Sequence, residues 1–140
     1  MIRKADIVKK QQQDYKNSLS SIIKRVQESK HKAITTVNRL LIELYWFIGE
    51  TTVNLQESSR WGDGVVDKLS RDLRTKYPNQ SGFSSRNLWD CKRFYLTYRD
   101  FSKLRPLVTE ICWTNNLILI NYTKSIEEKE FYIKMCGKMN

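Results

Sequence analysis

Glycine and proline are scarce in this sequence, which contains five glycines and two prolines among its 140 residues. Because these residues are the usual interruptions of helices, their scarcity favours long helices. The hydrophobic fraction of 40% and the charged fraction of 29% are typical of a globular chain and argue against a disordered one. We therefore expect an all-α protein with a core of its own.

The sequence also lacks the residue patterns of a metal site or of an enzyme. Its three cysteines are widely spaced without a CxxC pair, and it has one histidine, which argues against a zinc site. We expect Cys91 and Cys112 to be reduced core residues and His31 to lie on the surface. A Gly-rich phosphate loop, an HExxH motif and a nucleophile elbow are all absent from the sequence, so we expect neither a cofactor nor catalysis.

A PD-(D/E)XK nuclease site and a membrane span are missing from the sequence as well. The nuclease site needs a carboxylate pair and a lysine on adjacent strands to hold Mg²⁺, and the chain has no Pro-Asp dipeptide. Residues 28–30 and 127–129 match the second half of that motif only in letters, because both lie in helical patterns. No apolar run approaches the ~18 residues of a membrane span, and the N-terminus lacks the apolar region of a signal peptide, so we expect a cytoplasmic protein.

Positive charge is abundant and unevenly distributed. The net charge is +10, to which residues 1–40 and residues 68–105 each contribute +7, whereas residues 41–67 carry −4. A basic surface of this kind favours a polyanionic partner, most often nucleic acid. The alternative is a solvated basic surface that only keeps the protein soluble.

Residues 82–98 have the strongest helical pattern. Ser84 or Ser85 can cap the helix by accepting a hydrogen bond from a free N–H one turn on. Spacings of three and four residues define one apolar side, formed by Leu88, Cys91, Tyr95 and Tyr98. The opposite side carries Arg86, Asp90, Arg93 and Thr97. Aromatic residues on the buried side and arginines near the start are typical of a recognition helix.

A second basic helix is predicted directly before it. Asp63 can cap this helix, which ends at Tyr77 because Pro78 disfavours helical geometry in the residue before it. Its exposed side presents four basic residues, Lys68, Arg71, Arg74 and Lys76. Two basic helices joined by a turn at 78–83 have the outline of a helix-turn-helix, although three or four residues are the usual connection. An αα-hairpin without affinity for DNA is the alternative.

DNA contacts can be assigned to this pair of helices residue by residue. We expect phosphates to be bound by Lys68, Arg71, Arg74, Lys92 and Arg93. Arg86, beside Ser85 at the helix start, is the candidate to reach a guanine edge in the major groove. Asp90 lies four residues after Arg86 and could pair with it instead. Trp89 could either pack or stack, and Asn87 is expected to hold the turn.

The N-terminal region predicts a long helix over residues 18–55, preceded by a flexible basic arm or a loosely formed first helix over residues 1–17. Apolar residues recur in the long helix every three or four positions, broken only by Lys30, and they are Leu19, Ile23, Val26, Ala33, Val37, Leu40, Leu44 and Phe47. This spacing suits either packing within the domain or a paired coil between two chains. Trp46 and Phe47 are expected in the core, whereas the narrow stripe of the N-terminal half favours self-association.

Two shorter helices are expected near the C-terminus. The apolar segment 107–122 predicts a buried helix capped by Thr114, although its LILI run also fits a buried strand. The segment 125–135 opens with SIEE, a capping box in which Glu128 can bond back toward Ser125. The apolar side of this last helix is expected to be formed by Phe131, Tyr132 and Met135.

Several of these segments resemble one known family. They are YWFIG (45–49), WGDGVVDKLSRDLRTKYP (61–78) and GFSSRNLWDCKRFY (82–95), followed in the same order by ICWTNNLILI (111–120) and EEKEFYI (127–133). These motifs are similar to the N-terminal domain of the YhcG family, bacterial proteins in which this domain precedes a PD-(D/E)XK nuclease domain. The resemblance implies a helical, DNA-binding module over residues 18–140, whose partner in full-length relatives is the nuclease domain.

Two main hypotheses for the function follow. In the first, the chain is a non-catalytic DNA-binding or targeting module of a nuclease, which contacts DNA through its basic helix-turn-helix-like surface. In the second, it is a protein-interaction module in which the long helix builds a homodimer and DNA is not contacted directly. A third hypothesis is an enzyme whose site is completed only by a further domain.

Overall fold

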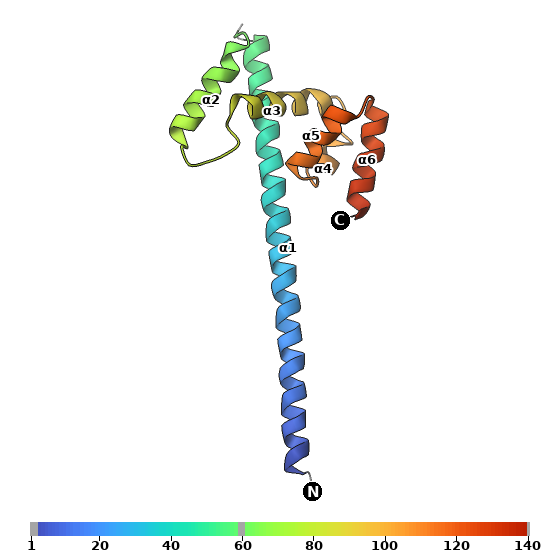
Figure 1. Cartoon of the computed structure of the whole chain (residues 1–140). Coiled ribbons are helices and arrows are strands. Elements are labelled where there is room, and N and C mark those ends of the chain that lie inside the picture. Colours follow the sequence, from blue (N-terminus) through green and yellow to red (C-terminus); the bar gives the residue numbers. More distant parts are fainter. Residues whose placement is uncertain (1–2, 59–60, 140) are drawn as a thin grey trace. The chain divides into compact units, whose positions relative to one another are not determined.

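The computed structural model describes residues 3–58 and 61–139, and that part of the chain contains six helices and no strand. The helices are α1 (Lys4–Ser58), α2 (Gly64–Lys76), α3 (Ser85–Tyr98), α4 (Arg105–Val108), α5 (Trp113–Tyr122) and α6 (Ile126–Met139) (Figure 1). The all-α class and the long N-terminal helix predicted from the sequence are therefore confirmed. The chain divides into two units, Met1–Thr36 and Val37–Asn140.

The first unit consists of the N-terminal part of α1. This helix begins at Lys4, so residues 4–17 are helical, which is the second of the two interpretations of that region. Residues 1–2 of the predicted arm lie outside the described residues. Every described side chain from residue 3 to residue 34 is exposed, so this stretch contributes nothing to a core within the chain.

The larger core cluster of the second unit is built around α3. Its buried members come from the end of α1, from α3 and from the region of α4, α5 and α6, and they are Ile42, Trp46, Phe94, Tyr98, Leu104, Val108, Ile111, Leu119 and Ile133. Aromatic side chains meet edge to face at its centre, with ring centroids 5.6 Å apart for Trp46 and Phe94 and 5.5 Å apart for Phe94 and Tyr98. Such edge-to-face pairs add stability beyond the area they bury.

A smaller core cluster joins α2 to the start of α3. Val65, Val66, Phe83 and Leu88 are buried in it, and Ile48 and Leu55 of α1 pack against it together with Leu69, Leu73 and Trp89. Because α3 contributes to both clusters, its position is fixed from two sides. The basic helix pair predicted from the sequence is thus part of the packed second unit.

Helices α1 and α3 cross each other (Figure 1), and their closest approach involves Gly49. This glycine is buried, and a Cβ atom placed on it would lie 2.8 Å from the carbonyl carbon of Cys91 and 2.9 Å from the Cβ of Tyr95. Glycine is therefore the residue that lets the two helices cross here.

Helix ends agree with the sequence in part. Ser84 caps α3, and Ser125 caps α6 by accepting a hydrogen bond of 3.1 Å from the backbone N–H of Glu128. The Asp63 prediction was wrong, because this residue precedes α2 without a capping bond and its carboxylate instead accepts from the Gln56 amide at 3.5 Å. Thr114 is not a cap either, because α5 begins one residue earlier, after Cys112.

Several residues expected in the core are exposed. Phe47 is 62% exposed because the second unit buries the neighbouring side of α1, which carries Ile42 and Trp46, and the next residue in a helix points about 100° away. Cys112 is exposed in the extended link before α5. Among the described side chains of α6 the buried apolar one is Ile133, whereas the predicted trio is exposed and comprises Phe131, Tyr132 and Met135.

Candidate nucleic-acid interface

The connection between α2 and α3 is held by hydrogen bonds. It runs over residues 77–84, longer than the usual turn of a helix-turn-helix. The buried hydroxyl of Ser70, in α2, donates to the carbonyl of Phe83 at 2.7 Å. Gly82 has a φ of 100°, a conformation that other residues rarely adopt, just before the Ser84 cap of α3.

Asn87 holds this turn, as the sequence predicts. Its side-chain amide donates to the carbonyl of Gly82 at 2.7 Å, and its side-chain oxygen accepts from the indole N–H of Trp113 at 2.8 Å. One residue thereby ties together the turn, the start of α3 and α5. The first turn of α3 is consequently presented on a rigid support.

The two sides of α3 are distributed much as predicted. The buried side consists of Leu88, Cys91, Phe94 and Tyr98, with Tyr95 half-buried beside them. Burial raises the pKa of the Cys91 thiol well above its ordinary value, so this cysteine stays protonated and unreactive. Arg86 and Arg93 are exposed on the other side.

Asp90 pairs with Arg93 and not with Arg86. The guanidinium of Arg93 lies 3.4 Å from the Asp90 carboxylate and donates to the side-chain oxygen of Asn121 at 2.6 Å. Among the described residues, no ion pair or side-chain hydrogen bond engages the guanidinium of Arg86. Arg86 is therefore available to a ligand, whereas Arg93 is already held between two helices.

Trp89 is half-buried and packs against the smaller core cluster. The ammonium of Lys92 lies over its ring, 4.8 Å from the centroid. Packing is thus the observed role of Trp89, and the cation–π contact keeps the positive charge of Lys92 close to the ring. Ser85, the first residue of α3, is half-buried beside the Ser84 cap.

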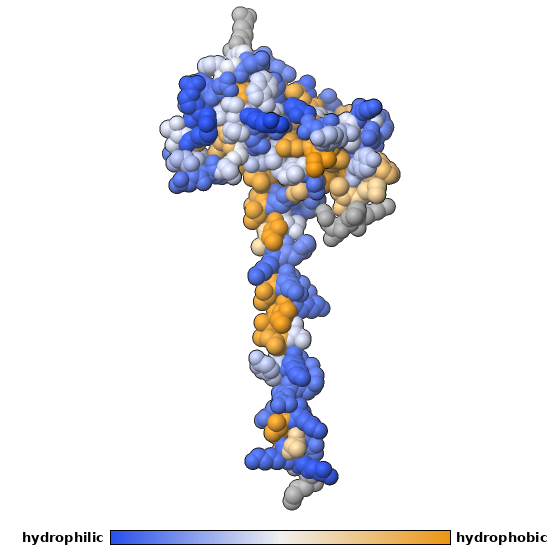
Figure 2. Space-filling model, in the orientation of Figure 1, coloured by the Kyte–Doolittle hydropathy of each residue, from blue (hydrophilic) through white to orange (hydrophobic). Residues whose placement is uncertain are grey.

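The basic residues of α2 are all exposed. Lys68 lies 3.4 Å from the Asp72 carboxylate, an exposed pair one helical turn apart that contributes little to stability. Arg74 donates through Nε to the carbonyl of Ser70 at 3.3 Å. Within the described chain the guanidinium of Arg71 has no ion pair or side-chain hydrogen bond. Figure 2 shows mostly hydrophilic residues over the visible side of α2.

The predicted residues therefore form two basic surfaces on adjacent helices of one packed unit. The sequence did not indicate the side chains that contact some of the basic residues. Asn121 is 28 positions from Arg93, Glu57 lies 3.6 Å from Arg99, and Arg105 stacks over Trp46 at 4.6 Å. These contacts join distant parts of the chain, so no local spacing indicates them.

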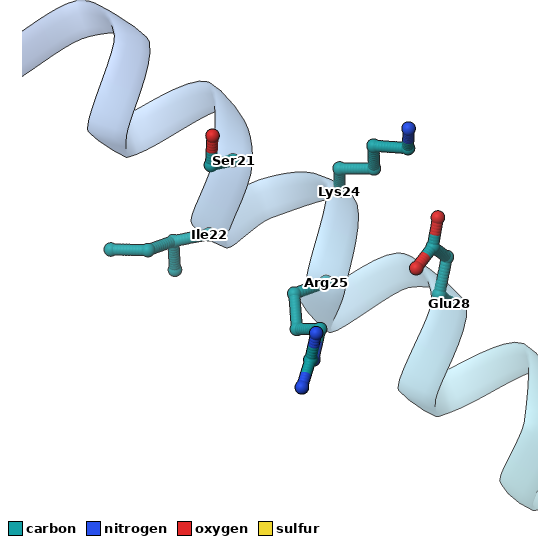
Figure 3. A pocket seen from close by; sticks show the side chains of 5 residues that line it. All are labelled: Ser21, Ile22, Lys24, Arg25 and Glu28. Atoms are coloured by element: carbon teal, nitrogen blue, oxygen red, sulfur yellow. The ribbon is translucent and has the colours of Figure 1, made fainter.

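The described residues give little support for a small-molecule site, a metal site or a membrane span. The hollow in Figure 3 is lined by Ser21, Ile22, Lys24, Arg25 and Glu28, which all belong to α1. Since one helix supplies the whole lining, nothing encloses a ligand there as small-molecule sites require. Among residues 3–58 and 61–139, no three His, Cys, Asp or Glu side chains gather in a group that could hold a metal ion. No helix in the same ranges combines the length and apolar character needed to cross a membrane.

Comparison with known families identifies the domain. A family model described as the DUF1016 N-terminal domain matches residues 21–140. The chain belongs to this family. It is the N-terminal domain of the DUF1016/YhcG family, so the resemblance found in the sequence is confirmed. In this DUF1016 N-terminal domain the matched range includes both basic helices and most of α1. No curated protein and no solved structure matches the chain.

Proposed function

We propose that this DUF1016 N-terminal domain is the non-catalytic DNA-binding or targeting module of a bacterial nuclease. The observation that carries the proposal is the exposed positive charge on two adjacent helices, in particular Arg71 and Arg86, whose guanidinium groups engage no other described side chain. Charges that are not neutralised within the protein are the ones that release counterions when they meet phosphates.

The residues have different roles in this proposal. Lys68, Arg71, Arg74 and Lys92 bind phosphates, which positions the protein without reading sequence. Arg86 lies at the start of α3 on the turn held by Asn87, and it is the residue that reaches a base edge. Arg93 contributes less than the sequence predicts, because Asp90 and Asn121 already engage it.

A salt titration tests the proposal. Binding of the full chain to a short DNA duplex is measured by fluorescence anisotropy at about 50 mM and 200 mM salt, between which phosphate-driven affinity falls steeply. Arg71→Ala is expected to lower the log–log slope by about 0.9 and to weaken binding to all sequences. Arg86→Ala is expected to weaken binding by about 1–3 kcal/mol and to relax any sequence preference.

Lys134→Ala in α6 is the matched control. It removes one positive charge that is paired with Glu130 at 2.9 Å, away from both basic helices, and we expect it to leave the slope unchanged. An affinity that responds neither to salt nor to Arg71→Ala and Arg86→Ala would overturn the proposal. In that case the alternative, an interaction module without direct DNA contact, would be favoured.

A further inference from the structure

An apolar seam runs along α1 and is exposed. The α1 seam is defined here as Leu19, Ile23, Val26, Ala33, Val37, Leu40, Leu44 and Phe47. All eight side chains are exposed, Val37 to 65% and Leu40 to 60%. Figure 2 shows hydrophobic residues recurring on α1. Isolated exposed apolar residues are ordinary, but a long row of this kind, broken only by Lys30, is typical of an interaction surface.

The seam has the period of a coiled coil. Leu19, Val26, Ala33, Leu40 and Phe47 are spaced by seven residues, and Ile23, Lys30, Val37 and Leu44 form the second row of the same heptad. The register holds over four heptads, long enough to indicate a coiled coil.

In each unit, no other described part of that unit packs over the seam. In the second unit the opposite side of α1 is used by the core, where Ile42, Trp46 and Val53 are buried, so a partner can reach only the seam side. In the first unit no described side chain up to residue 34 is buried. Because most helical stability in proteins comes from packing an apolar face, this long stretch requires a partner from outside the chain.

We propose that the partner is a second copy of this chain, with the two α1 seams paired antiparallel. In this arrangement the first-unit seam of one copy packs on the second-unit seam of the other. The apolar pairs are Val26 with Val37, Ile23 with Leu40 and Leu19 with Leu44. The one polar residue in the middle of the seam, Lys30, then lies opposite Ala33 of the second copy, where the small side chain leaves room for its stem.

Charge complementarity selects this orientation. Residues 4–32 carry eight basic and three acidic residues, whereas residues 33–58 carry three acidic residues and one basic residue, Arg39, which is already paired with Glu110 at 2.9 Å. Antiparallel pairing brings the basic half of each α1 against the acidic half of the other. Parallel pairing would instead place like charges together and Lys30 against itself, which is unfavourable.

Molecular mass is the first test. In sedimentation at up to about 100 µM, where a dimer of micromolar Kd is populated, we expect a species of twice 16.7 kDa. The double variant Val26→Asp, Leu40→Asp is expected to be monomeric. Because both side chains are exposed, the variant should keep the thermal unfolding transition of the second unit, which shows that loss of mass is not loss of fold.

The matched control is Ile118→Asp in α5. Ile118 is another large apolar side chain, 47% exposed, that lies outside the seam, and this variant should remain dimeric. A wild-type chain that is monomeric throughout, or a seam variant as heavy as the wild type, would overturn the proposal. A monomeric chain that binds vesicles or another protein through the seam would overturn it as well.

Orientation is tested separately by cysteine cross-linking. In a Cys112→Ser, Cys136→Ser background, oxidation of a mixture of Val26→Cys and Val37→Cys chains should give a cross-linked dimer. Val26→Cys alone should not cross-link to itself, because antiparallel pairing separates the two copies of this position by about 16 Å along the axis. A Val26–Val26 cross-link, or no cross-link in the mixture, would contradict the antiparallel arrangement.

Discussion

Tyr98 carries a polar hydroxyl group into the core. Its side chain is fully buried, and within the described residues its hydroxyl has no hydrogen-bond partner. Burial raises the pKa of Tyr98 to about 12, because the phenolate cannot be solvated in the core. The folded protein therefore keeps this proton at pH values where the unfolded chain releases it.

Replacing Tyr98 by Phe tests this assignment. Near neutral pH we expect Tyr98→Phe to be stabilising by about 1 kcal/mol or neutral, because it removes a buried hydroxyl without a partner. In the wild type, the free energy of unfolding should fall as the pH rises from about 10 toward about 12, since the unfolded tyrosine ionises there first. The variant lacks this contribution.

Urea unfolding of both proteins at about pH 8 and about pH 11 is the measurement, and the advantage of the variant should grow at the higher pH. The other tyrosines titrate in both proteins, so the difference between them isolates Tyr98. A difference that stays constant with pH, or a variant that is strongly destabilised near neutral pH, would contradict the assignment.

For single residues, capping and turn hydrogen bonds could be predicted from the sequence, whereas the burial of side chains could not. The Ser84 cap and the bond from Asn87 to Gly82 join atoms within five residues, so residue type and position indicated these roles, whereas the bond between Asn87 and Trp113 joins distant segments and was not predicted. Phe47 was misassigned because the buried side of α1 is chosen by helices that follow it in the chain. Asn116 was not recognised at all, although its buried amide donates to the carbonyls of Val108 and Ile111 at 3.0 and 2.9 Å and holds the link between α4 and α5.

At the scale of helices, the crossing of α1 and α3 at Gly49 determines how α3 is held. Gly49→Ala would drive a Cβ into the backbone of Cys91, which cannot move without shifting α3. We expect a loss of about 1–3 kcal/mol in the free energy of unfolding, the usual range for overpacking a core. Gly64→Ala is the control, because a Cβ at that position would have no neighbour within 4 Å.

Chemical denaturation of the two alanine variants and the wild type is the measurement. Equal stability of the Gly49 and Gly64 variants would show that the crossing tolerates a wider separation than the structure has. A stabilised Gly64→Ala is compatible with the account, since alanine is the better helix former.

Most helix positions could be predicted from the spacing of apolar residues and from residues that cap or end helices. The end of α2 at Lys76 follows from Pro78, and the start of α3 from Ser84. The four-residue helix α4 escaped prediction because it is too short to show a period. The N-terminal extension of α1 to Lys4 was left open, since residues 4–17 are polar and have no strong apolar pattern.

On the scale of the whole molecule, the described part of the chain presents basic surfaces on α2 and α3 and an apolar seam on α1. Net charge by segment could be counted from the sequence and indicated the basic surfaces. The sequence did not indicate which of these charges remain unpaired, because the Arg93–Asn121 and Arg99–Glu57 contacts join distant segments. The family match over residues 21–140 includes α2, α3 and the seam from Ile23 onward, but not Leu19.

The most direct test of DNA binding by the basic surface is an NMR titration of the isotope-labelled full chain with a short DNA duplex. We expect the amide signals of residues 64–76 and 85–93 to shift in a saturable way and those of α6 to stay unchanged. We also expect the shifts to shrink as salt is raised, because counterion release drives the binding. No shifts at low salt, or shifts confined to residues outside α2 and α3, would contradict the proposed DNA binding.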